Sequence, residues 1–190
     1  MSQIQIRNAE KADINHIIGT ADAVFGDGYT EIDQIANDEK KYAIVANVNG
    51  QFAGFCCGNI LDADKLEDLV KKDLGVVPDD IRIANCEGKL GLIKTIAVNE
   101  RFGSNGIGTR LLKDAEQKLI GLGATCIIVP AWKVGGKTPI KNLLERFSYK
   151  EWIENDTYWK KDCENQKFEC ISFCESCQCS VVFYRSYQLK

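Results

Sequence analysis

The chain has 190 residues, a length that favours one domain with a sizeable core. Hydrophobic residues make up 45% and charged residues 27%, which is ordinary for a soluble globular protein. The net charge of −3 gives no basic footprint for nucleic acid, and no apolar run approaches a membrane span, so neither partner is expected.

The first residues, MSQIQIRNAEK, are polar and charged, so they do not resemble a signal peptide and predict a cytoplasmic protein. Nine cysteines are many for that compartment, and five of them fall between Cys163 and Cys179. In a reducing cytosol, clustered cysteines favour a metal or redox role over a disulfide framework.

The N-terminal part predicts a strand followed by a helix. Ile4 and Ile6 alternate with polar residues, which is typical of a strand, and about Asp13–Phe25 carries apolar residues on one helical face. Gly26-Asp27-Gly28 ends that helix, and Glu31–Asp38 is a candidate second helix. His16, the only histidine, has no second ligand nearby at metal spacing and is interpreted as structural.

Next come two strand-like runs, Lys41–Asn47 and Gln51–Ile60, joined at Asn49-Gly50, which is a strong hairpin signal. Leu61–Val77 is an acidic amphipathic helix candidate that Pro78-Asp79-Asp80 ends. Further predicted elements are a short strand at Ile81–Cys86 and, after the turn Glu87-Gly88-Lys89, a central apolar strand at Leu90–Val98.

A glycine-rich loop follows the central strand. Apolar residues then recur at helical spacing at Ile107, Leu111, Leu112, Ala115 and Leu119. Glycines let a backbone turn sharply and let a ligand approach its amides. The N–H groups of the first helical turn, together with the helix dipole, suit a phosphate or pyrophosphate. The alternative is a strand-to-helix connection whose glycines only make the turn, because a glycine pattern alone is weak evidence.

The stretch 96–112, IAVNERFGSNGIGTRLL, resembles the acetyl-CoA-binding motif of the GNAT N-acetyltransferase superfamily, R/Q-x-x-G-x-G/A. Gly106 and Gly108 match its two glycines, whereas Gly103 replaces the leading Arg or Gln, for which Arg101 could substitute. RNAEKADINHI is similar to the opening of a GNAT domain. The resemblance implies acetyl-CoA binding at Ile96, Ala97, Val98, Gly103, Ser104, Asn105, Gly106, Ile107, Gly108 and Thr109.

The remaining predicted elements follow the helix after the glycine-rich loop. They are a strand at Ala124–Val129, a last helix at Thr138–Phe147, and two closing strands at Tyr149–Ile153 and Ser180–Tyr187. The resemblance implies an α/β protein with the GNAT acyl-CoA N-acyltransferase fold, a mixed, mostly antiparallel central sheet flanked by helices. Residues 1–190 then form a single domain, with a Cys-rich segment at 163–179 before the last strand.

Residues 131–138, AWKVGGKT, fit a loose form of the phosphate-binding P-loop. Pro139 follows directly, Trp132 and Val134 are bulky for a loop that wraps phosphates, and too little chain remains for a nucleotide-hydrolase sheet. A P-loop nucleotide-binding protein is therefore the less favoured alternative. In the GNAT frame the segment is a basic loop from which Lys133 or Lys137 could touch CoA phosphates.

The resemblance implies an acyltransferase that moves the acetyl group of acetyl-CoA to a primary amine of an unidentified acceptor, in a monomer or homodimer. The Val98 N–H would stabilise the oxyanion. GNAT enzymes often use a glutamate near the central strand as base and a tyrosine on the last helix as acid. Glu87 is the candidate base and Tyr149 the candidate acid, with Tyr158 or water as substitutes. The alternative is a non-catalytic acyl-CoA-binding sensor.

The Cys-rich segment reads Cys163-x6-Cys170-x3-Cys174-x2-Cys177-x-Cys179. Short cysteine spacings on a turn can supply the four soft ligands that zinc prefers. This pattern predicts a structural, all-thiolate zinc site, with Cys163 able to replace one of the flanking ligands. The four predicted ligands are Cys170, Cys174, Cys177 and Cys179. A redox-active thiol cluster and unligated cysteines are the alternatives.

Overall fold

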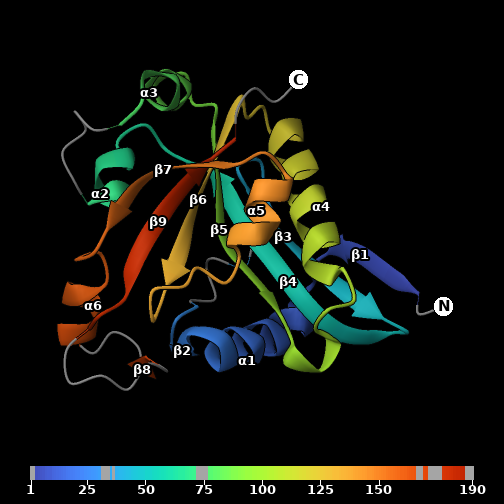
Figure 1. The fold of residues 1–190 in the computed structure, drawn as a ribbon. Helices are drawn as coiled ribbons and strands as arrows, with labels where there is room; N and C mark the ends of the chain where they lie inside the picture. Colours follow the sequence, from blue (N-terminus) through green and yellow to red (C-terminus); the bar gives the residue numbers. More distant parts are fainter. Residues whose placement is uncertain are drawn as a thin grey trace.

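The structure is a computed structural model, and it describes residues 3–30, 35, 37–71, 77–165, 169–170 and 177–186, with the backbone alone at 169–170. Its main sheet has seven strands in the order β1-β3-β4-β5-β6-β9-β7 (Figure 1). The strands are β1 Ile4–Asn8, β3 Lys41–Val48, β4 Gln51–Ile60, β5 Leu90–Val98, β6 Cys126–Lys133, β7 Lys150–Asn155 and β9 Ser180–Arg185. Two-residue strands β2 Gly26–Asp27 and β8 Glu169–Cys170 form a separate small pair.

Neighbouring strands of the main sheet run antiparallel, except for the parallel pair β5 and β6. The predicted fold class, a mixed and mostly antiparallel sheet flanked by helices, is therefore confirmed. Strand alternation sets which residues reach each face of the sheet. On β3, for example, Ile44 packs into the core under one helix and Val45 into the core under another.

The described helices are α1 Ile14–Phe25, α2 Leu66–Val70, α3 Asp79–Cys86, α4 Ile107–Gly121, α5 Lys141–Arg146 and α6 Lys160–Glu164, with short 3-10 turns η1 Lys11–Asp13 and η4 Glu100–Phe102. The apolar stripe of α4, which includes Ile107, Leu111 and Leu119, packs into the largest core cluster with β3 and β5. Ile17 and Ala21 of α1 pack on the opposite face of the sheet. The helices thus cover both faces (Figure 1).

One predicted strand is wrong, because Ile81–Cys86 belongs to the helix α3. Pro78 is the N-cap of this helix and Asp79 lies in its first turn, where a carboxylate favours the helix dipole. Ile81 is fully buried whereas Ile83 is 58% exposed, so the two isoleucines do not share the face that a strand would give them.

The predicted helix Leu61–Val77 is also too long, because its described part is helical only at Leu66–Val70. Lys71 then takes a left-handed conformation with φ of 52°, which ends the helix. Of the predicted helix Glu31–Asp38, residues 31–34 and 36 lie outside the described residues, as does Tyr187 of the predicted closing strand.

A bidentate ion pair fixes the start of the chain. Asp13 accepts hydrogen bonds from both terminal nitrogens of Arg7, at 2.6 and 2.8 Å, and from the Glu10 N–H at 2.8 Å. The Asp13 side chain is only 7% exposed. The hydrogen bonds from Arg7 are the main reason that the pKa of Asp13 lies below its ordinary value of 3.8, and the bond from the Glu10 N–H lowers this pKa further.

We expect Asp13→Asn to lower the free energy of unfolding by about 2 kcal/mol at pH 7, because it leaves the Arg7 guanidinium without its charge partner. The depressed pKa means that this stabilisation is present above about pH 4 and is lost as the pH falls through the folded-state pKa. Urea unfolding of both proteins at pH 7 and pH 3 should show the difference shrinking at the lower pH. Asp62→Asn, which breaks an exposed pair with Lys40, is the control that should change little.

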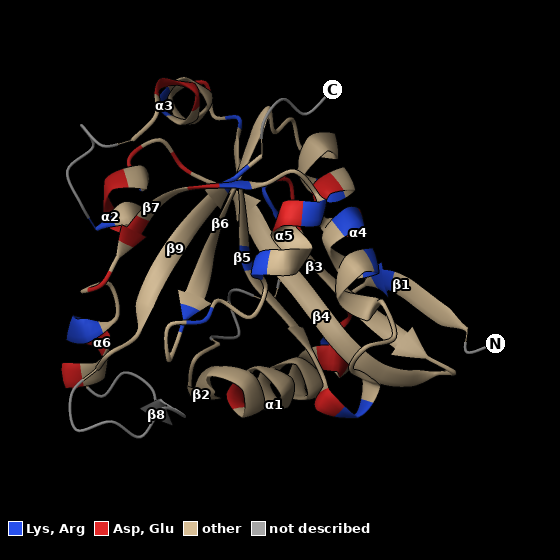
Figure 2. Ribbon diagram, in the orientation of Figure 1, with Lys and Arg blue, Asp and Glu red and all other residues tan. Residues whose placement is uncertain are grey.

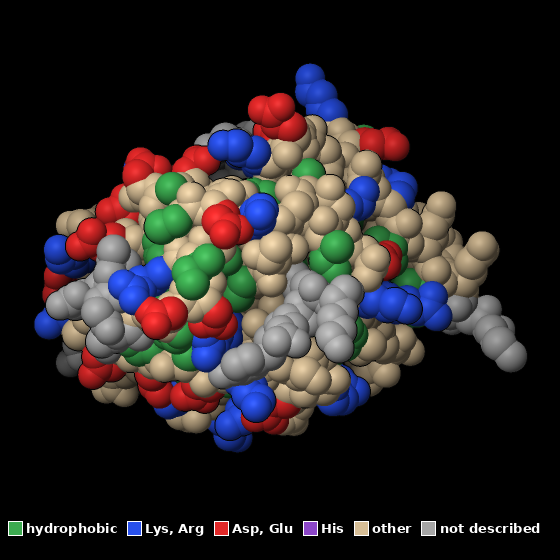
Figure 3. All heavy atoms as spheres, turned by 90° about the horizontal axis from the view of Figure 1, so that it is seen from above, with side chains coloured by type: hydrophobic (Ala, Val, Ile, Leu, Met, Phe, Trp, Pro, Cys, Tyr) green, Lys and Arg blue, Asp and Glu red, His purple; other side chains and the backbone are tan. Residues whose placement is uncertain are grey.

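Charged side chains avoid the centre of the sheet. Figure 2 shows Asp and Glu on α2 and α3, whereas β5, β6 and β9 carry few charges. The face seen from above mixes acidic, basic and hydrophobic side chains (Figure 3). Among the described helices, none combines the length and apolar character needed to span a membrane.

Candidate functional site

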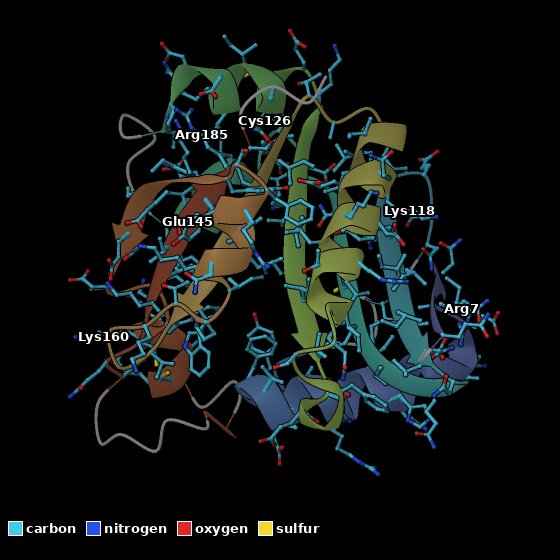
Figure 4. All side chains as sticks on the ribbon, turned by 45° about the vertical axis from the view of Figure 1, so that its right-hand side comes forward. Arg7, Lys118, Cys126, Glu145, Lys160 and Arg185 are labelled. Carbon is cyan, nitrogen blue, oxygen red and sulfur yellow. The ribbon has the colours of Figure 1, made fainter. Side chains whose placement is uncertain are left out.

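The site lies where the two halves of the sheet separate. β5 and β6 pair only over Leu90–Leu92 and Cys126–Ile128. Beyond these residues β6 stays paired with β9, and β5 stays paired with β4, so the two parallel strands diverge (Figure 1). The facing edge of β5 therefore offers backbone groups that the described sheet does not pair. Figure 4 places Cys126 and Arg185 at the paired end of this seam and Lys160 toward the opposite end.

A bulge in β5 accompanies the separation. Gly58 of β4 faces Ile93, but the next residue back, Cys57, faces Thr95, so Lys94 is the extra residue. A bulge bends its strand and increases the local twist. Close backbone approach is possible here because β4 has glycine at residue 58: a Cβ on it would overlap the Leu92 carbonyl oxygen.

The cleft between the diverging strands has a volume of about 270 Å³. Ile93–Ile96 of β5 and Val129–Trp132 of β6 form its two walls. Other segments add Val24, Phe25, Tyr29, Pro139, Ile140 and Trp159 to its lining. Of the described residues that line it, Lys94 alone is charged. A cleft of this kind suits a ligand with an extended, weakly polar arm.

The N–H of Val98 lies on the β5 edge that faces away from β4, two residues beyond Ile96, the last residue of this strand that lines the cleft. The next residue, Asn99, donates its N–H to the Ala53 carbonyl of the β4 side at 2.9 Å. Successive N–H groups of a strand alternate between its two edges, so the Val98 N–H lies on the edge toward β6. It is thus available to a bound group in the opening.

The glycine loop lies beside this strand end. Gly106 is the N-cap of α4 with φ of 73°, a left-handed conformation that glycine adopts without strain. The Asn105 side chain donates to the carbonyls of Phe102 and Gly103, each at 3.2 Å, which holds the loop. The N–H groups of residues 107–109 have no acceptor within a helix, and no side chain caps this end.

Strand end and helix start meet at Gly108. A Cβ placed on it would lie 3.9 Å from Val98 Cγ2 and 3.5 Å from Leu143 Cδ2 of α5. The structure therefore brings Val98, Gly106 and Gly108, all predicted from the sequence, to one place. Ser104 takes a left-handed conformation with φ of 64°, and Arg101, in η4, is exposed.

The P-loop alternative is wrong. Gly135 and Gly136 form a tight turn in which Val134 and Lys137 exchange both backbone hydrogen bonds at 3.0 Å. Those amides are therefore unavailable to a phosphate, and α5 begins only at Lys141. Lys133, predicted as a possible CoA contact, instead pairs with the Glu154 carboxylate at 2.7 Å.

The structure does not bring the proposed acid and base to the cleft walls. Glu87 is exposed at the C-cap of α3 and pairs with Lys89 at 3.0 Å. It precedes β5, whereas Val98 ends that nine-residue strand, which spans roughly 26 Å at strand rise. Tyr149 is only 2% exposed and lies in the core, where burial raises the pKa of its hydroxyl and the neighbouring Glu116 carboxylate raises it further.

Aromatic side chains are the functional candidates that sequence reasoning missed. Phe25 stacks on Tyr29 with ring centroids 4.6 Å apart, and meets Trp132 edge-on at 6.1 Å. Trp159 lies 6.2 Å from Tyr29. These rings come from segments far apart in the chain, so no spacing or periodicity could have pointed to them.

Three cysteines of the C-terminal segment line a hollow together with these rings. Cys163, Cys177 and Cys179 line a small hollow of about 10 Å³ together with Phe25, Tyr29, Trp132 and Trp159. In the part of the chain that is described, no three His, Cys, Asp or Glu side chains form a metal-binding group. Cys174 and the side chain of Cys170 lie outside the described residues, so the zinc site stays a prediction.

We expect protein purified without metal-affinity steps to contain about one zinc per chain if the predicted all-thiolate site exists. The double variant Cys174→Ser/Cys177→Ser should lose it, whereas Cys86→Ser, which changes an exposed cysteine on α3, should not. Elemental analysis of the wild type and of both variants measures the zinc content. Absence of metal together with freely titrating tail thiols would refute the site.

The model of the acetyltransferase (GNAT) family matches residues 11–135, a range that contains β5, the glycine loop and α4. No curated protein matches the sequence. Many solved structures share the fold. One is an IAA acetyltransferase from Bacillus cereus, with 18% identity, a TM-score of 0.64, and coverage of 98% of this chain and 100% of that one.

Two further neighbours carry informative names. The ribosomal-protein-S18-alanine N-acetyltransferase from Escherichia coli is 12% identical, with a TM-score of 0.61 and coverage of 97% of this chain and 93% of that one. A Bacillus anthracis acetyltransferase in complex with acetyl coenzyme A is 10% identical, with a TM-score of 0.61 and coverage of 99% and 98%. At these identities the likeness is one of fold.

Proposed function

The chain belongs to the GNAT acetyltransferase family, an acyltransferase class that uses acetyl-CoA, and from this premise we propose that it acetylates a primary amine on an acceptor entering between β5 and β6. The observation that carries the proposal is that the start of α4 lies against Val98, at the end of the strand that forms one wall of the cleft, with the Val98 N–H on the β5 edge away from β4. The pyrophosphate of CoA would bind the amides of residues 107–109, and its pantetheine arm would follow the free edge of β5.

The chemistry needs few groups. The neutral amine attacks the thioester carbonyl, the C–S bond breaks, and CoA leaves as a thiolate that takes up a proton. The Val98 N–H would donate a hydrogen bond to the oxyanion of the tetrahedral intermediate. Holding both substrates in one cleft supplies the proximity that this transfer requires. No acidic side chain among the described residues lines the cleft, so we assign the removal of the amine proton to solvent water.

Isothermal titration with acetyl-CoA, followed by a thiol-release assay over a panel of amines, tests the proposal. Binding followed by CoA release with at least one amine supports it. Binding without release on any amine would favour a non-catalytic acyl-CoA-binding protein, and absence of binding would refute the proposal.

Glu87→Gln tests the base proposed from the sequence. A general base acts within about 3 Å of the proton or through one water, and Glu87 is distant from Val98. We therefore expect the variant to keep turnover within about threefold of wild type from pH 6 to 9. A loss of about 10²-fold at neutral pH that shrinks at high pH would instead establish Glu87 as the base.

A further inference from the structure

Lys94 lies where two pockets meet. It lines the cleft between β5 and β6, and it also lines a second pocket of about 490 Å³, which we call the outer chamber. The cleft and the outer chamber share four lining residues, which are Tyr29, Lys94, Pro130 and Trp159. The two pockets are therefore adjacent, and Lys94 stands at their boundary.

The bulge in β5 brings an amine to this boundary. Lys94 is the extra residue of the bulge, and it is exposed although its neighbours Ile93 and Thr95 are buried. Bulges next to active sites commonly re-aim a side chain. Of the described residues that line the cleft, Lys94 is also the one that carries a primary amine.

The free edge of β5 lies close to this amine. Because Asn99 donates its N–H toward β4 and strand N–H groups alternate, the N–H of Ile96 lies on the same edge as that of Val98, away from β4. Lys94 precedes Ile96 by two residues, which is roughly 7 Å at strand rise. The flexible four-carbon stem of a lysine spans about that distance, so an acyl group held at this edge is within its reach.

Other charged side chains share the outer chamber with Lys94. They are Lys65, Asp68 and Asp162. Asp162 pairs with Lys71 at 3.0 Å, and Asp68 pairs with Lys65 at 3.6 Å, so each carboxylate has a cation partner other than Lys94. Lys65 lines the outer chamber but not the cleft, which makes it an internal control for the reactivity of Lys94.

Resting on the acetyl transfer proposed above, we propose that Lys94 is a site of self-acetylation, whose amine accepts the acetyl group of acetyl-CoA bound to the same chain. The neutral amine attacks the thioester carbonyl, the amide bond forms, and the C–S bond breaks. The CoA thiolate leaves with the electron pair of that bond and takes up the proton that the nitrogen loses. Because one chain holds both groups, the transfer has the advantage of an intramolecular reaction.

Self-acetylation changes the charge of the cleft. N-acetyl-lysine carries no positive charge, so the reaction removes the charge at the boundary of the two pockets. The described lining of the cleft is then uncharged.

Incubation of the protein with acetyl-CoA alone, followed by mass spectrometry of its peptides, tests the proposal. We expect acetylation of Lys94 to proceed at least tenfold faster than that of Lys65, whose half-exposed side chain reports the uncatalysed reaction with the thioester. An excess of CoA should slow the reaction at Lys94 at least tenfold and leave that at Lys65 unchanged. The rate constant at Lys94 should be independent of protein concentration, because donor and acceptor belong to one chain.

Lys94→Arg and Lys65→Arg are matched variants. Arginine keeps the positive charge but is not deprotonated in proteins, so it does not accept the acetyl group. The mass of the intact protein should show that Lys94→Arg lacks the acetyl group that the wild type gains first, whereas Lys65→Arg gains it at the wild-type rate.

Equal rates at Lys94 and Lys65, or a rate constant at Lys94 that rises in proportion to protein concentration, would overturn the inference. Calorimetric titration with acetyl-CoA distinguishes this failure from failure of the proposed function. Binding of acetyl-CoA without acetylation of Lys94 overturns the inference alone, whereas absence of binding refutes the proposed function and the inference with it.

Discussion

Replacement of Gly58 by alanine is expected to lower the free energy of unfolding by about 3 kcal/mol and the melting temperature by about 9 °C. A Cβ at this position overlaps the Leu92 carbonyl oxygen and lies 2.9 Å from the Tyr42 ring. Neither neighbour can move easily, because Leu92 belongs to β5 at the bulge and Tyr42 is 1% exposed in the core. Thermal unfolding followed by circular dichroism measures the effect.

Gly19→Ala is the matched control for this variant. Gly19 lies inside α1, and a Cβ there meets nothing within 4 Å. Alanine favours a helix over glycine, so this change should raise stability by up to about 1 kcal/mol. An unchanged melting temperature in Gly58→Ala would mean that the β4 and β5 backbones separate at little cost, which would contradict the tight bulge described here.

Replacement of Gly108 by valine is expected to weaken acetyl-CoA binding at least tenfold, the equivalent of about 1.4 kcal/mol. The added Cβ lies in ordinary contact with Leu143 and Val98, and the two γ carbons beyond it crowd the space between α4, α5 and the end of β5. Side chains there obstruct the approach of the pyrophosphate to the first-turn amides. Isothermal titration calorimetry gives the dissociation constant.

Gly121→Val controls for the exchange of glycine for valine in the same helix, since Gly121 ends α4 and a Cβ there meets nothing within 4 Å. This variant should bind acetyl-CoA like the wild type. If Gly108→Val folds and keeps the wild-type dissociation constant, the glycine loop is not the CoA site.

The sequence predicted what strong periodicity and turn chemistry encode. The Asn49-Gly50 hairpin, the apolar strand Leu90–Val98 and the helix after Gly106 are all present, because each has a local signal that tertiary packing reinforces. The helix α3 was predicted as a strand for a physical reason. Ile81 and Ile83 sit two residues apart like strand residues, but the proline and acidic residues before them start a helix, and Ile81 and Ala84 form its buried face.

The candidate site also has a part that the sequence predicted and a part that it did not. The loop at Gly106 and Gly108 is contiguous in sequence, so its glycine pattern was visible. The rings of Phe25, Tyr29, Trp132 and Trp159 come from α1, the segment after β2, β6 and the start of α6, and only the folded chain brings them together. Nor does local sequence show that β5 and β6 pair over three residues and then diverge, because register depends on the strands that flank each of them.

The strand order has a consequence for folding during synthesis. β9, residues 180–185, lies between β6 and β7 and is the strand with which β7 pairs in the described sheet. β6 and β7 therefore leave the ribosome before the strand that joins them. Until β9 inserts, both present unpaired backbone edges, which are prone to pair with other chains. A nascent chain stalled before residue 180 should consequently stay protease-sensitive in β7 even after β1 to β5 have become protected.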